Sequence, residues 1–475
     1  MKKITISIIF IIFICLIILK TEQIIRGKIY AYNVSQFYNE PENIDVFFIG
    51  SSRIYYPMSP MYIWNTYGIT SYNRGSSGQY YKLTYLFTEE IIKKYKPKLL
   101  IIDILYLESL AFEGPNRVDI SLANMENSLF KLNSYKYIYN TWYDSTEHIN
   151  TYNRFHTRWK ELNKYDFKTD SFWKGQYTGT FINIYWDKLH LITPQKRTTT
   201  NINNDIQLNP ETIKYANKIF ELTKKNNISI LFIKIPNPTN NFSAFDIAFA
   251  KLAKEKNWNF INYNNLIDQL NINYDTDFRD ISHLNLYGSR KLMDHLIPYI
   301  IEKYNIPNRK NDPEFASWNE DYKKYERAIN REEIREIKDF DKWFNLAMYQ
   351  DYIITIASRN GLPKNIDKNL FNYLDRLRLS KIKEYKPKDN YIAIIDDKKV
   401  FDEQIGKNNL SFKGRMKRIV NLNIFSSINK ADIFISGTNR SKNSNGLNFV
   451  IYDKINREIV DSIWINPTNS SKVNR

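Results

Sequence analysis

The chain has 475 residues, a length that suggests about three domains. Hydrophobic residues make up 43% of the chain and aromatic residues 15%, which is enough for packed cores and excludes a wholly disordered protein. The net charge is +17, but the sequence contains neither a dense Lys/Arg tract nor a nucleic-acid-binding module, so DNA or RNA is not an expected partner. The basic charge favours contact with anionic lipid or an anionic envelope polymer.

The first element is an uncharged apolar segment at residues 4–19, flanked by lysines. As a helix it would be about 24 Å long, slightly less than the roughly 30 Å hydrocarbon core of a membrane. No small-x-small cleavage site follows it, and bulky residues precede Cys15, unlike a lipoprotein cysteine. We therefore predict a signal anchor within residues 1–21, which makes this a single-pass cell-membrane protein with most of the chain extracytoplasmic. A cleaved signal peptide is the alternative.

After a polar stalk at residues 22–43, short apolar runs alternate with amphipathic segments up to residue 306. The expected strands lie in "DVFFIG", "GITSYNRGSSG", "KLLIIDIL", "ISILFIKIP" and "WNFINY". The expected helices are "TYLFTEEIIKKY", "ETIKYANKIFELTKKNN" and "YGSRKLMDHLIPYIIEKY". Apolar runs separated by helices indicate an α/β domain at 44–306 with a parallel sheet covered on both faces.

Residues from about 112 to 205 interrupt this alternation. They are rich in Tyr, Trp and Asn and have only patchy helical periodicity, as in "YKYIYNTWYDSTEHINTYNRF". Two interpretations are open. The insertion is either a helical subdomain that packs on the sheet, or a lid or substrate wall, because aromatic side chains stack on sugar rings and insertions on such sheets often border the site.

Residues 307–349 are highly charged and predict a helical connector. A second globular unit follows at 350–466, with a strand in "DYIITIAS", a helix in "KNLFNYLDRLRL", a strand in "NYIAIIDDKKV" and a hairpin whose turn lies near Lys454 to Arg457. We predict an α+β, β-rich domain here. The last residues, 467–475, are polar, and we expect a frayed tail.

Cysteine and histidine usage limits the chemistry of the exported part. Cys15 is the only cysteine and lies within the predicted anchor, so neither a disulfide nor a thiol nucleophile is expected outside the membrane. The five histidines show no metal-ligand spacing beside carboxylates or cysteines. We predict no metal site and no cofactor.

The stretch "VFFIGSSR" is a candidate nucleophile turn. An apolar strand ends at Gly50, and Ser51 and Ser52 follow at the expected carboxyl edge of the sheet, where open α/β folds bind ligands. A serine attacks a carbonyl only when a base accepts its proton and donors hold the developing oxyanion. The two hydroxyls could equally belong to a simple turn, so other parts of the chain must supply the base and the donors.

A base and donors have candidates elsewhere in the sequence. In "DISHLNLYGSRKL", Asp280 precedes His283 by three residues, a spacing at which the carboxylate can accept Nδ1–H while Nε2 faces outward. The alternative is a helix start capped by Asp280. In "NRGSSGQ", Gly75 and Gly78 allow a backbone N–H to approach a ligand closely, and the alternative is an ordinary glycine turn.

Together these fragments, in this order, resemble the SGNH/GDSL hydrolase superfamily over residues 46–301. The resemblance implies a flavodoxin-like, three-layer α/β/α fold. It also implies Ser52 as the nucleophile, with Ser51 in place of the usual Asp, and the backbone N–H groups of Ser52 and Gly78 as the oxyanion hole. Asp280 and His283 would complete the catalytic residues.

One block of that family is missing. The third strand should lead into Gly-x-Asn, but the sequence has Leu105-Tyr106-Leu107, so the amide that would complete the oxyanion hole is absent. Loss of one such donor costs about 10²- to 10³-fold in rate. The departure fits divergent, membrane-anchored envelope members, similar to alginate-type O-acetyltransferases and the D-alanyl-transfer protein of teichoic acid modification. Those relatives usually act beside a membrane-bound O-acyltransferase, which is therefore an expected partner.

The unit at 350–466 is similar to the ILEI/PANDER domain. The stretch "GLNFVIYD", a tight turn and "IVDS" carry the resemblance, whereas the usual Phe-Asp-Thr ending reads Trp464-Ile465-Asn466 here. A related stem domain in a glycosyltransferase binds sugars, so the resemblance implies carbohydrate binding. The alternative is a β-rich packing module without a ligand.

Two hypotheses for function follow. The first is a membrane-anchored, extracytoplasmic serine acyltransferase or acylesterase of the O-acetyl type, acting on cell-envelope polysaccharide or acylated sugar. The second is a non-catalytic carbohydrate-binding or scaffold protein whose SGNH-like domain is degenerate.

Overall fold

A computed structural model describes residues 2–25, 37–38, 40, 43–108, 115–123, 125–139, 148–149, 152, 155–162, 207–237, 244–280, 282–416 and 419–475. The chain divides into two compact units, Met1–Lys323 and Lys324–Arg475, which are here called the N-terminal unit and the C-terminal unit and are described separately.

The N-terminal unit begins with the long apolar helix α1 (Lys2–Ile25). Its segment Ile4–Glu22 is long and apolar enough to cross a membrane, and none of it is buried in the protein. A signal sequence has the same length and composition. Most of the predicted stalk at 22–43 lies outside the described residues.

The core of the N-terminal unit is a five-stranded sheet, and all of its pairings are parallel. Its strands are β1 (Val46–Ile49), β2 (Ser71–Asn73), β3 (Leu99–Asp103), β4 (Ser229–Lys234) and β5 (Phe260–Asn262). The spatial order is β2-β1-β3-β4-β5, which is the flavodoxin order. The order reverses between β1 and β3, and ligands of such sheets bind beyond the carboxyl ends of the strands at that point.

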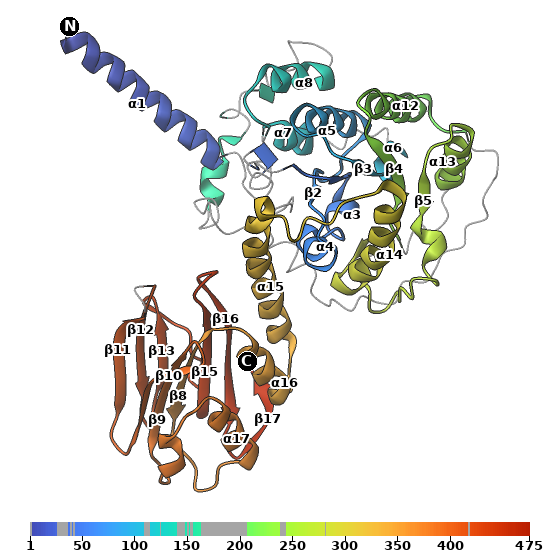
Figure 1. The fold of residues 1–475 in the computed structure, drawn as a ribbon. Coiled ribbons are helices and arrows are strands. Elements are labelled where there is room, and N and C mark those ends of the chain that lie inside the picture. Colours follow the sequence, from blue (N-terminus) through green and yellow to red (C-terminus); the bar gives the residue numbers. More distant parts are fainter. Residues whose placement is uncertain are drawn as a thin grey trace. The chain divides into compact units, whose positions relative to one another are not determined.

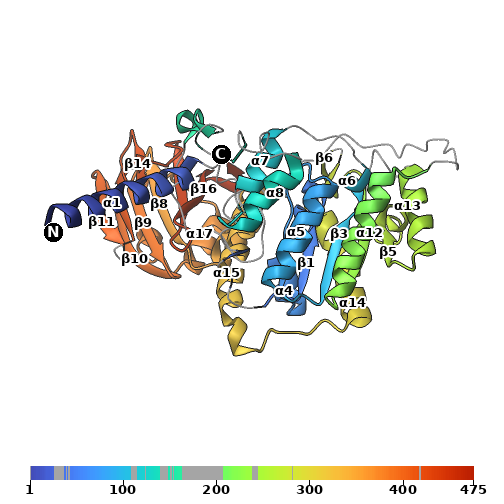
Figure 2. The ribbon, with the colours of Figure 1, turned by 90° about the horizontal axis from the view of Figure 1, so that it is seen from above.

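Helices cover both faces of this sheet (Figure 1). On one face, Val46 and Phe48 share a buried cluster with Ile63 of α4 and Leu292 of α14. On the other face, α5 contacts β1 and α12 contacts β4 (Figure 2). Phe232 of β4 packs against Phe249 of α13. The helices are α3 (Ser52–Tyr55), α4 (Pro60–Tyr67), α5 (Tyr81–Lys94), α12 (Pro210–Lys225), α13 (Ala244–Glu255) and α14 (Leu286–Tyr304), with the short η3 (Tyr263–Leu266) and η4 (Pro313–Phe315).

The predicted insertion is described only in part. Its described elements are α6 (Leu105–Glu108), α7 (Pro115–Ala123), α8 (Leu129–Tyr139) and η1 (Arg158–Glu161), whereas residues 163–206 lie outside the described residues. Tyr137 of α8 donates a hydrogen bond to the hydroxyl of Tyr215 (2.9 Å) and packs near Tyr85. Tyr137 of α8 therefore packs on α5 and α12, and the prediction of a lid or substrate wall stays open.

The C-terminal unit consists of two antiparallel sheets and flanking helices. The six-stranded sheet has the order β10-β9-β8-β15-β16-β17, and the four-stranded sheet has the order β11-β12-β13-β14. Ile392 and Ile394 of the first sheet share a buried cluster with Leu422 and Ile433 of the second. The strands are β8 (Ile353–Arg359), β9 (Asn390–Asp396), β10 (Lys399–Gly406), β11 (Leu410–Met416), β12 (Val420–Ser426), β13 (Ala431–Ile435), β14 (Thr438–Asn439), β15 (Gly446–Asp453), β16 (Glu458–Asn466) and β17 (Asn469–Asn474).

Helices cover the other face of the six-stranded sheet. Trp343 of α16 and Leu370 of α17 share a buried cluster with Phe449 of β15. The helices are α15 (Ala316–Glu336), α16 (Phe340–Tyr349), α17 (Lys368–Arg376) and the short η5 (Lys381–Glu384). The division between the two units falls within α15, which belongs to the predicted connector.

The expectation of a frayed tail at 467–475 is wrong. Residues Asn469–Asn474 form β17, which pairs with β16. Ser470 donates from its N–H and its hydroxyl to Asp367 (2.9 Å each), and the guanidinium of Arg475 lies 2.8 Å from a carboxylate oxygen of Asp461. The polar residues of this segment have partners within the unit, which composition alone does not reveal.

Candidate active site

The turn after β1 requires glycine at position 50. All four residues of β1 are buried, and the strand ends at Gly50, whose φ of +156° is rarely adopted by other residues. A Cβ atom at this position would lie 2.9 Å from Cγ2 of Ile54 and 3.1 Å from Cβ of Asp103. The close approach of β3 and of the following helix therefore leaves space only for glycine before the two serines.

The two serines have different environments. Ser51 is the N-cap of α3, where its Oγ accepts a hydrogen bond from the N–H of Arg53 (3.4 Å), and only 1% of the residue is exposed. Ser52 is the first residue of α3 and is only half-buried. The sequence offers two similar hydroxyls, but the fold uses Ser51 to cap the helix and leaves Ser52 at the edge of the sheet.

The Asp280–His283 pair is built on a small antiparallel ladder, β6 (Phe278–Asp280) and β7 (His283–Leu284). Asp280 Oδ1 accepts hydrogen bonds from the backbone N–H of Ser282 and of His283, both at 2.9 Å. Nδ1 of His283 lies 2.8 Å from Oδ1 and 2.9 Å from Oδ2 of the same carboxylate. The tight turn thus holds the imidazole against the carboxylate.

Asp280 is not the cap of the following helix. The N-cap of α14 is Asn285, whose Oδ1 accepts hydrogen bonds from the N–H of Tyr287 (3.0 Å) and of Gly288 (3.2 Å). Its Nδ2 donates to the carbonyl of Thr276 (2.6 Å), which ties the start of α14 to the loop before β6. Because Asn285 caps the helix, the Asp280 carboxylate is left to bond to the backbone of its own turn and to the imidazole of His283.

Ser52 and His283 meet although they are 231 residues apart in the sequence. Nε2 of His283 lies 2.8 Å from Oγ of Ser52. The ring of Tyr56 packs edge-on against the imidazole, with centroids 5.1 Å apart and an interplanar angle of 84°. The three predicted side chains therefore form one continuous chain of contacts, from the carboxylate through the imidazole to the hydroxyl.

The carboxylate of this chain is ionised at neutral pH. Burial alone would raise the pKa of Asp280, but the hydrogen bond and charge of His283, the N–H of Ser282 and the charge of Arg279 outweigh burial and lower the pKa to about 2. Arg279 Nη1 lies 3.8 Å from Oδ2 of Asp280. An ionised carboxylate at Nδ1 favours the tautomer that carries its proton on Nδ1, which leaves Nε2 to accept a proton.

The glycine-rich turn after β2 lies against the turn that carries the serines. The N–H of Ser76 donates to the carbonyl of Gly50 (3.2 Å), and a Cβ at Gly75 would lie only 2.2 Å from that carbonyl oxygen. Gly78 has a φ of +63° in the turn closed by Gln79 N–H and the carbonyl of Ser76 (3.2 Å). Within the described residues, neither the N–H of Ser52 nor that of Gly78 donates a hydrogen bond to the protein.

Leu107, where the SGNH resemblance would require an amide, faces the protein interior. It belongs to α6 and is only 1% exposed, and its carbonyl accepts a hydrogen bond from the hydroxyl of Thr212 in α12 (2.5 Å). The apolar side chain cannot donate to an oxyanion. Among the described residues, no group of three His, Cys, Asp or Glu side chains is arranged to hold a metal ion.

The sequence reasoning missed a buried charged cluster beside the turn that carries the two serines. Asp103 and Lys234 end β3 and β4, and Nζ of Lys234 lies 2.9 Å from Oδ1 of Asp246. Burial raises the pKa of Asp103 to about 6, although the charges of Lys234 and Arg53 act in the opposite direction. The available signal was a charged residue at the end of each otherwise apolar run, "LLIID" and "ILFIK".

Comparisons with known proteins give little. No protein-family model matches the chain, and neither does any curated protein. Among solved structures, one matching chain is a candidate acylhydrolase of Bacteroides fragilis NCTC 9343, with 12% sequence identity and a TM-score of 0.29 over 57% of this chain and 95% of that chain. A similarity this weak carries no argument for the activity, which must be judged from the site itself.

Proposed function

We propose that the N-terminal unit is a serine acyl hydrolase or acyltransferase of the SGNH type. Ser52 is the nucleophile, His283 is the general base and acid, and Asp280 orients the imidazole. The observation that supports this most strongly is the 2.8 Å separation of His283 Nε2 and Ser52 Oγ, with the Asp280 carboxylate 2.8 Å from Nδ1. This is the arrangement that a serine nucleophile requires.

The reaction proceeds in two stages. In the first, Oγ of Ser52 attacks the carbonyl carbon of an ester while Nε2 of His283 takes the hydroxyl proton. The tetrahedral intermediate then breaks the bond to the alcohol, which leaves with the proton from His283, and the acyl group stays on Ser52 as an ester. In the second stage, water or a sugar hydroxyl loses its proton to His283 and attacks the same carbonyl carbon. The bond between that carbon and Ser52 Oγ then breaks, and His283 returns the proton to Ser52, which frees the acid or the new ester.

The oxyanion of each intermediate is held by the backbone N–H groups of Ser52 and Gly78, which have no protein acceptor among the described residues. Leu107 supplies no third donor. The missing amide lowers the rate by about 10²- to 10³-fold relative to a complete oxyanion hole. Enzymatic accelerations of 10⁶-fold or more are common, so two donors are compatible with catalysis, although with a slower enzyme.

The setting of the reaction is the outer face of the cell membrane. Helix α1 acts as an uncleaved signal anchor, so that residues 44–306 work outside the cytoplasm on O-acetylated or acylatable envelope polysaccharide. A membrane-bound O-acyltransferase is the partner that supplies the acyl group in the transferase version. Residues 307–349 form a helical connector in this proposal, and residues 350–466 form an ILEI/PANDER-like domain.

The decisive experiment is labelling with a serine-reactive fluorophosphonate. Ser52→Ala abolishes labelling and acyl-enzyme formation and leaves the fold unchanged. Ser51→Ala is the matched control, since it removes only a helix cap, at a cost of about 1 kcal/mol, and keeps the labelling. Full labelling and full acyl transfer by Ser52→Ala would show that this assignment is wrong.

A second candidate function is a scaffold that binds carbohydrate without catalysis. The buried Leu107 at the position of the family amide favours it. Release of acetate from a chromogenic acetyl ester by the wild-type chain, with loss of release in His283→Ala, would refute the scaffold. An inert wild-type chain that still binds acetylated polysaccharide would support it.

A further inference from the structure

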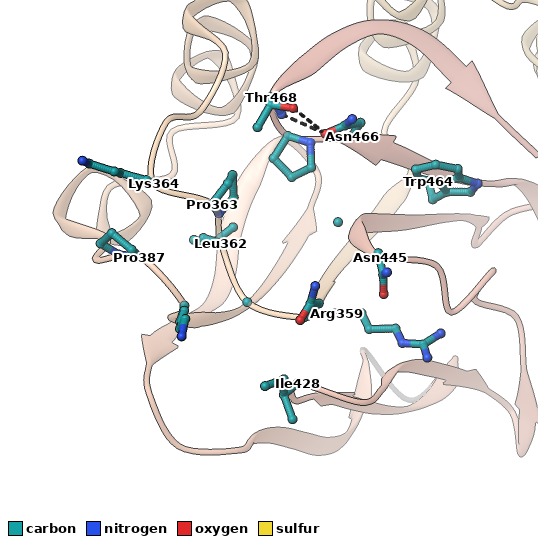
Figure 3. A pocket seen from close by; sticks show the side chains of 15 residues that line it. Arg359, Leu362, Pro363, Lys364, Pro387, Ile428, Asn445, Trp464, Asn466 and Thr468 are labelled. Atoms are coloured by element: carbon teal, nitrogen blue, oxygen red, sulfur yellow. Dashed lines mark hydrogen bonds between the residues drawn. The ribbon is translucent and has the colours of Figure 1, made fainter.

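The C-terminal unit contains a pocket of about 710 Å³ at one end of its sheets. Its walls come from segments far apart in the sequence, at residues 359–364, 387–388, 428, 445–446, 464 and 466–468 (Figure 3). They include the ends of β8 and β16 and the start of β15. A volume in this range is typical of pockets that bind small molecules.

The backbone of the walls is held in place before any ligand arrives. The N–H of Leu362 donates to the carbonyl of Asp389 (2.8 Å), and the N–H of Lys388 donates to the carbonyl of Leu362 (2.7 Å). On the other side, the N–H of Asp367 donates to the carbonyl of Pro467 (2.8 Å). Because these bonds already join the loops, a ligand would not have to order them, which reduces the entropic cost of binding.

The pocket is cationic. Arg359, Lys364 and Lys388 line it, and none of its lining residues, all of which the structure describes, is Asp or Glu. These three cations form no ion pair with a described carboxylate. Nη1 of Arg359 donates to the carbonyl of Asn443, whereas its Nε is buried without a hydrogen-bond partner.

Several cations elsewhere in the unit are paired with carboxylates. Each of the following lies within 3.1 Å of a carboxylate oxygen: Arg327, Arg331, Arg335, Lys454 and Arg475. By contrast, the pocket brings together Arg359 and two exposed lysines, Lys364 and Lys388, without a carboxylate in its lining. Uncompensated cations around a concave site attract an anion.

The pocket also offers a flat apolar surface. Trp464 is half-buried and lines the pocket together with Pro363 and Pro467. The amides of Asn445 and Asn466 lie beside it, and Oδ1 of Asn466 accepts hydrogen bonds from Thr468 (Figure 3). An indole face with nearby amides suits a pyranose ring, whose C–H groups pack on the aromatic ring while its hydroxyls bond to the amides.

We propose that this pocket binds a saccharide unit that carries a negative charge, either a carboxylate or a phosphate. Trp464 packs under the sugar ring, and Arg359, Lys364 and Lys388 surround the anion. The assignment of the ligand as a sugar depends on the proposed activity toward polysaccharide. The preference for an anion depends only on the residues that line the pocket. The C-terminal unit thereby selects charged polymers.

Calorimetric titration of the full-length Ser52→Ala chain in a neutral detergent tests the specificity. The probes are trigalacturonate, glucose 6-phosphate, neutral maltotriose and inorganic phosphate. At least one of the charged sugars should bind at least tenfold more tightly than maltotriose and than inorganic phosphate, and the affinity should fall with added NaCl. Trigalacturonate and glucose 6-phosphate distinguish a carboxylate from a phosphate. Equal affinity for maltotriose or for inorganic phosphate, or no binding of either charged sugar, would overturn the proposal.

Variants locate the binding. Trp464→Ala and the double variant Lys364→Gln/Lys388→Gln should each weaken binding at least tenfold. The matched control is Lys398→Gln/Lys399→Gln, which removes the same charge from exposed positions at the opposite end of β9 from Lys388 and outside the pocket lining, and should stay within twofold of the parent. Weakening by the control as large as by the pocket lysines would place binding on the general basic surface and overturn the proposal. The lysine variants keep the test decisive if Trp464→Ala does not fold.

Binding and catalysis can fail separately. The titrations use a chain without the Ser52 hydroxyl, so they do not depend on turnover. Hydrolysis of a small acetyl ester by the wild-type enzyme should be unchanged by Lys364→Gln/Lys388→Gln. Binding of a charged sugar without ester hydrolysis would support the proposed binding site and contradict the proposed enzymatic activity. Ester hydrolysis without binding of a charged sugar would contradict only the proposed binding site.

Discussion

Two histidine–aspartate pairs in the described part of the N-terminal unit have very different surroundings. In one pair, Nδ1 of His148 lies 2.9 Å from Oδ2 of Asp119, and in the other, Nδ1 of His283 lies 2.8 Å from Oδ1 of Asp280. Tyr139 stacks on the ring of His148 with centroids 3.9 Å apart, and its hydroxyl donates to Asp119. The carboxylate of Asp119 is fully buried, whereas 36% of the Asp280 side chain is exposed.

The difference lies in the third group that each histidine meets. Nε2 of His283 meets the hydroxyl of Ser52 at the carboxyl edge of the sheet. Among the described residues, no serine hydroxyl bonds to His148, and its ring packs face to face with a tyrosine. A histidine beside a carboxylate is thus a packing unit in one place and a candidate proton acceptor in the other, and the third group decides which.

Replacing each histidine by alanine should give the largest difference in activity between the two pairs. We expect His283→Ala to lower kcat for a chromogenic acetyl ester by about 10³-fold or more, because the general base and acid is lost. His148→Ala should leave kcat within about threefold and lower stability by about 1–2 kcal/mol, because a stacked ring and a hydrogen bond are lost. Steady-state kinetics and urea unfolding measure the two effects. Equal loss of kcat in both variants would contradict the comparison.

Replacing each aspartate by asparagine tests the same difference between the two pairs. Asp280→Asn should lower kcat by about 10²- to 10⁴-fold, because an amide no longer favours the tautomer with its proton on Nδ1. Asp119→Asn should leave kcat nearly unchanged and destabilise the fold by about 1–3 kcal/mol, because the buried partner of Tyr139 and His148 changes. A full rate in Asp280→Asn would remove the positioning role assigned to this carboxylate.

The smallest expected effect is a dependence of stability on pH. Because the pKa of Asp280 is lowered from 3.8 to about 2 in the fold, its ionised form stabilises the protein above about pH 4 and this contribution disappears as the pH falls to about 2. After allowance for solvent screening of a partly exposed group, the contribution is about 1 kcal/mol. Unfolding of the wild type and of Asp280→Asn at several pH values measures it, and a stability difference that is as large at pH 2 as above pH 4 would contradict it.

The sequence predicted much of the fold, because local patterns report local structure. Runs of mostly apolar residues such as "VFFI" and "LLIID" predicted strands, and the apolar segment at 4–19 predicted a helix of membrane-crossing length. The turn expected near Lys454 to Arg457 is the turn between β15 and β16. The tail was mistaken because a polar edge strand has no hydrophobic periodicity, and its partners Asp367 and Asp461 lie elsewhere in the chain.

The candidate site was only partly accessible from the sequence. The order of the glycine–serine turn, the second glycine turn and the Asp-x-x-His segment suggested which residues to compare. The structure distinguishes the two serines because Ser51 caps α3 and Ser52 does not. The structure also shows that Asn285, and not Asp280, caps α14. Asp103, Lys234 and Asp246 went unnoticed because each belongs to a different element.

By itself, the sequence determined where strands, helices and an apolar N-terminal segment form, since these depend on side-chain periodicity and on turn residues a few positions apart. Only the tertiary structure decided that Ser52 and His283 stand 2.8 Å apart, that Leu107 points into the core, and that three cations of the C-terminal unit surround a pocket without a carboxylate. These are contacts between distant segments, created when parallel pairing and sheet packing bring strand ends together, and no local pattern encodes them.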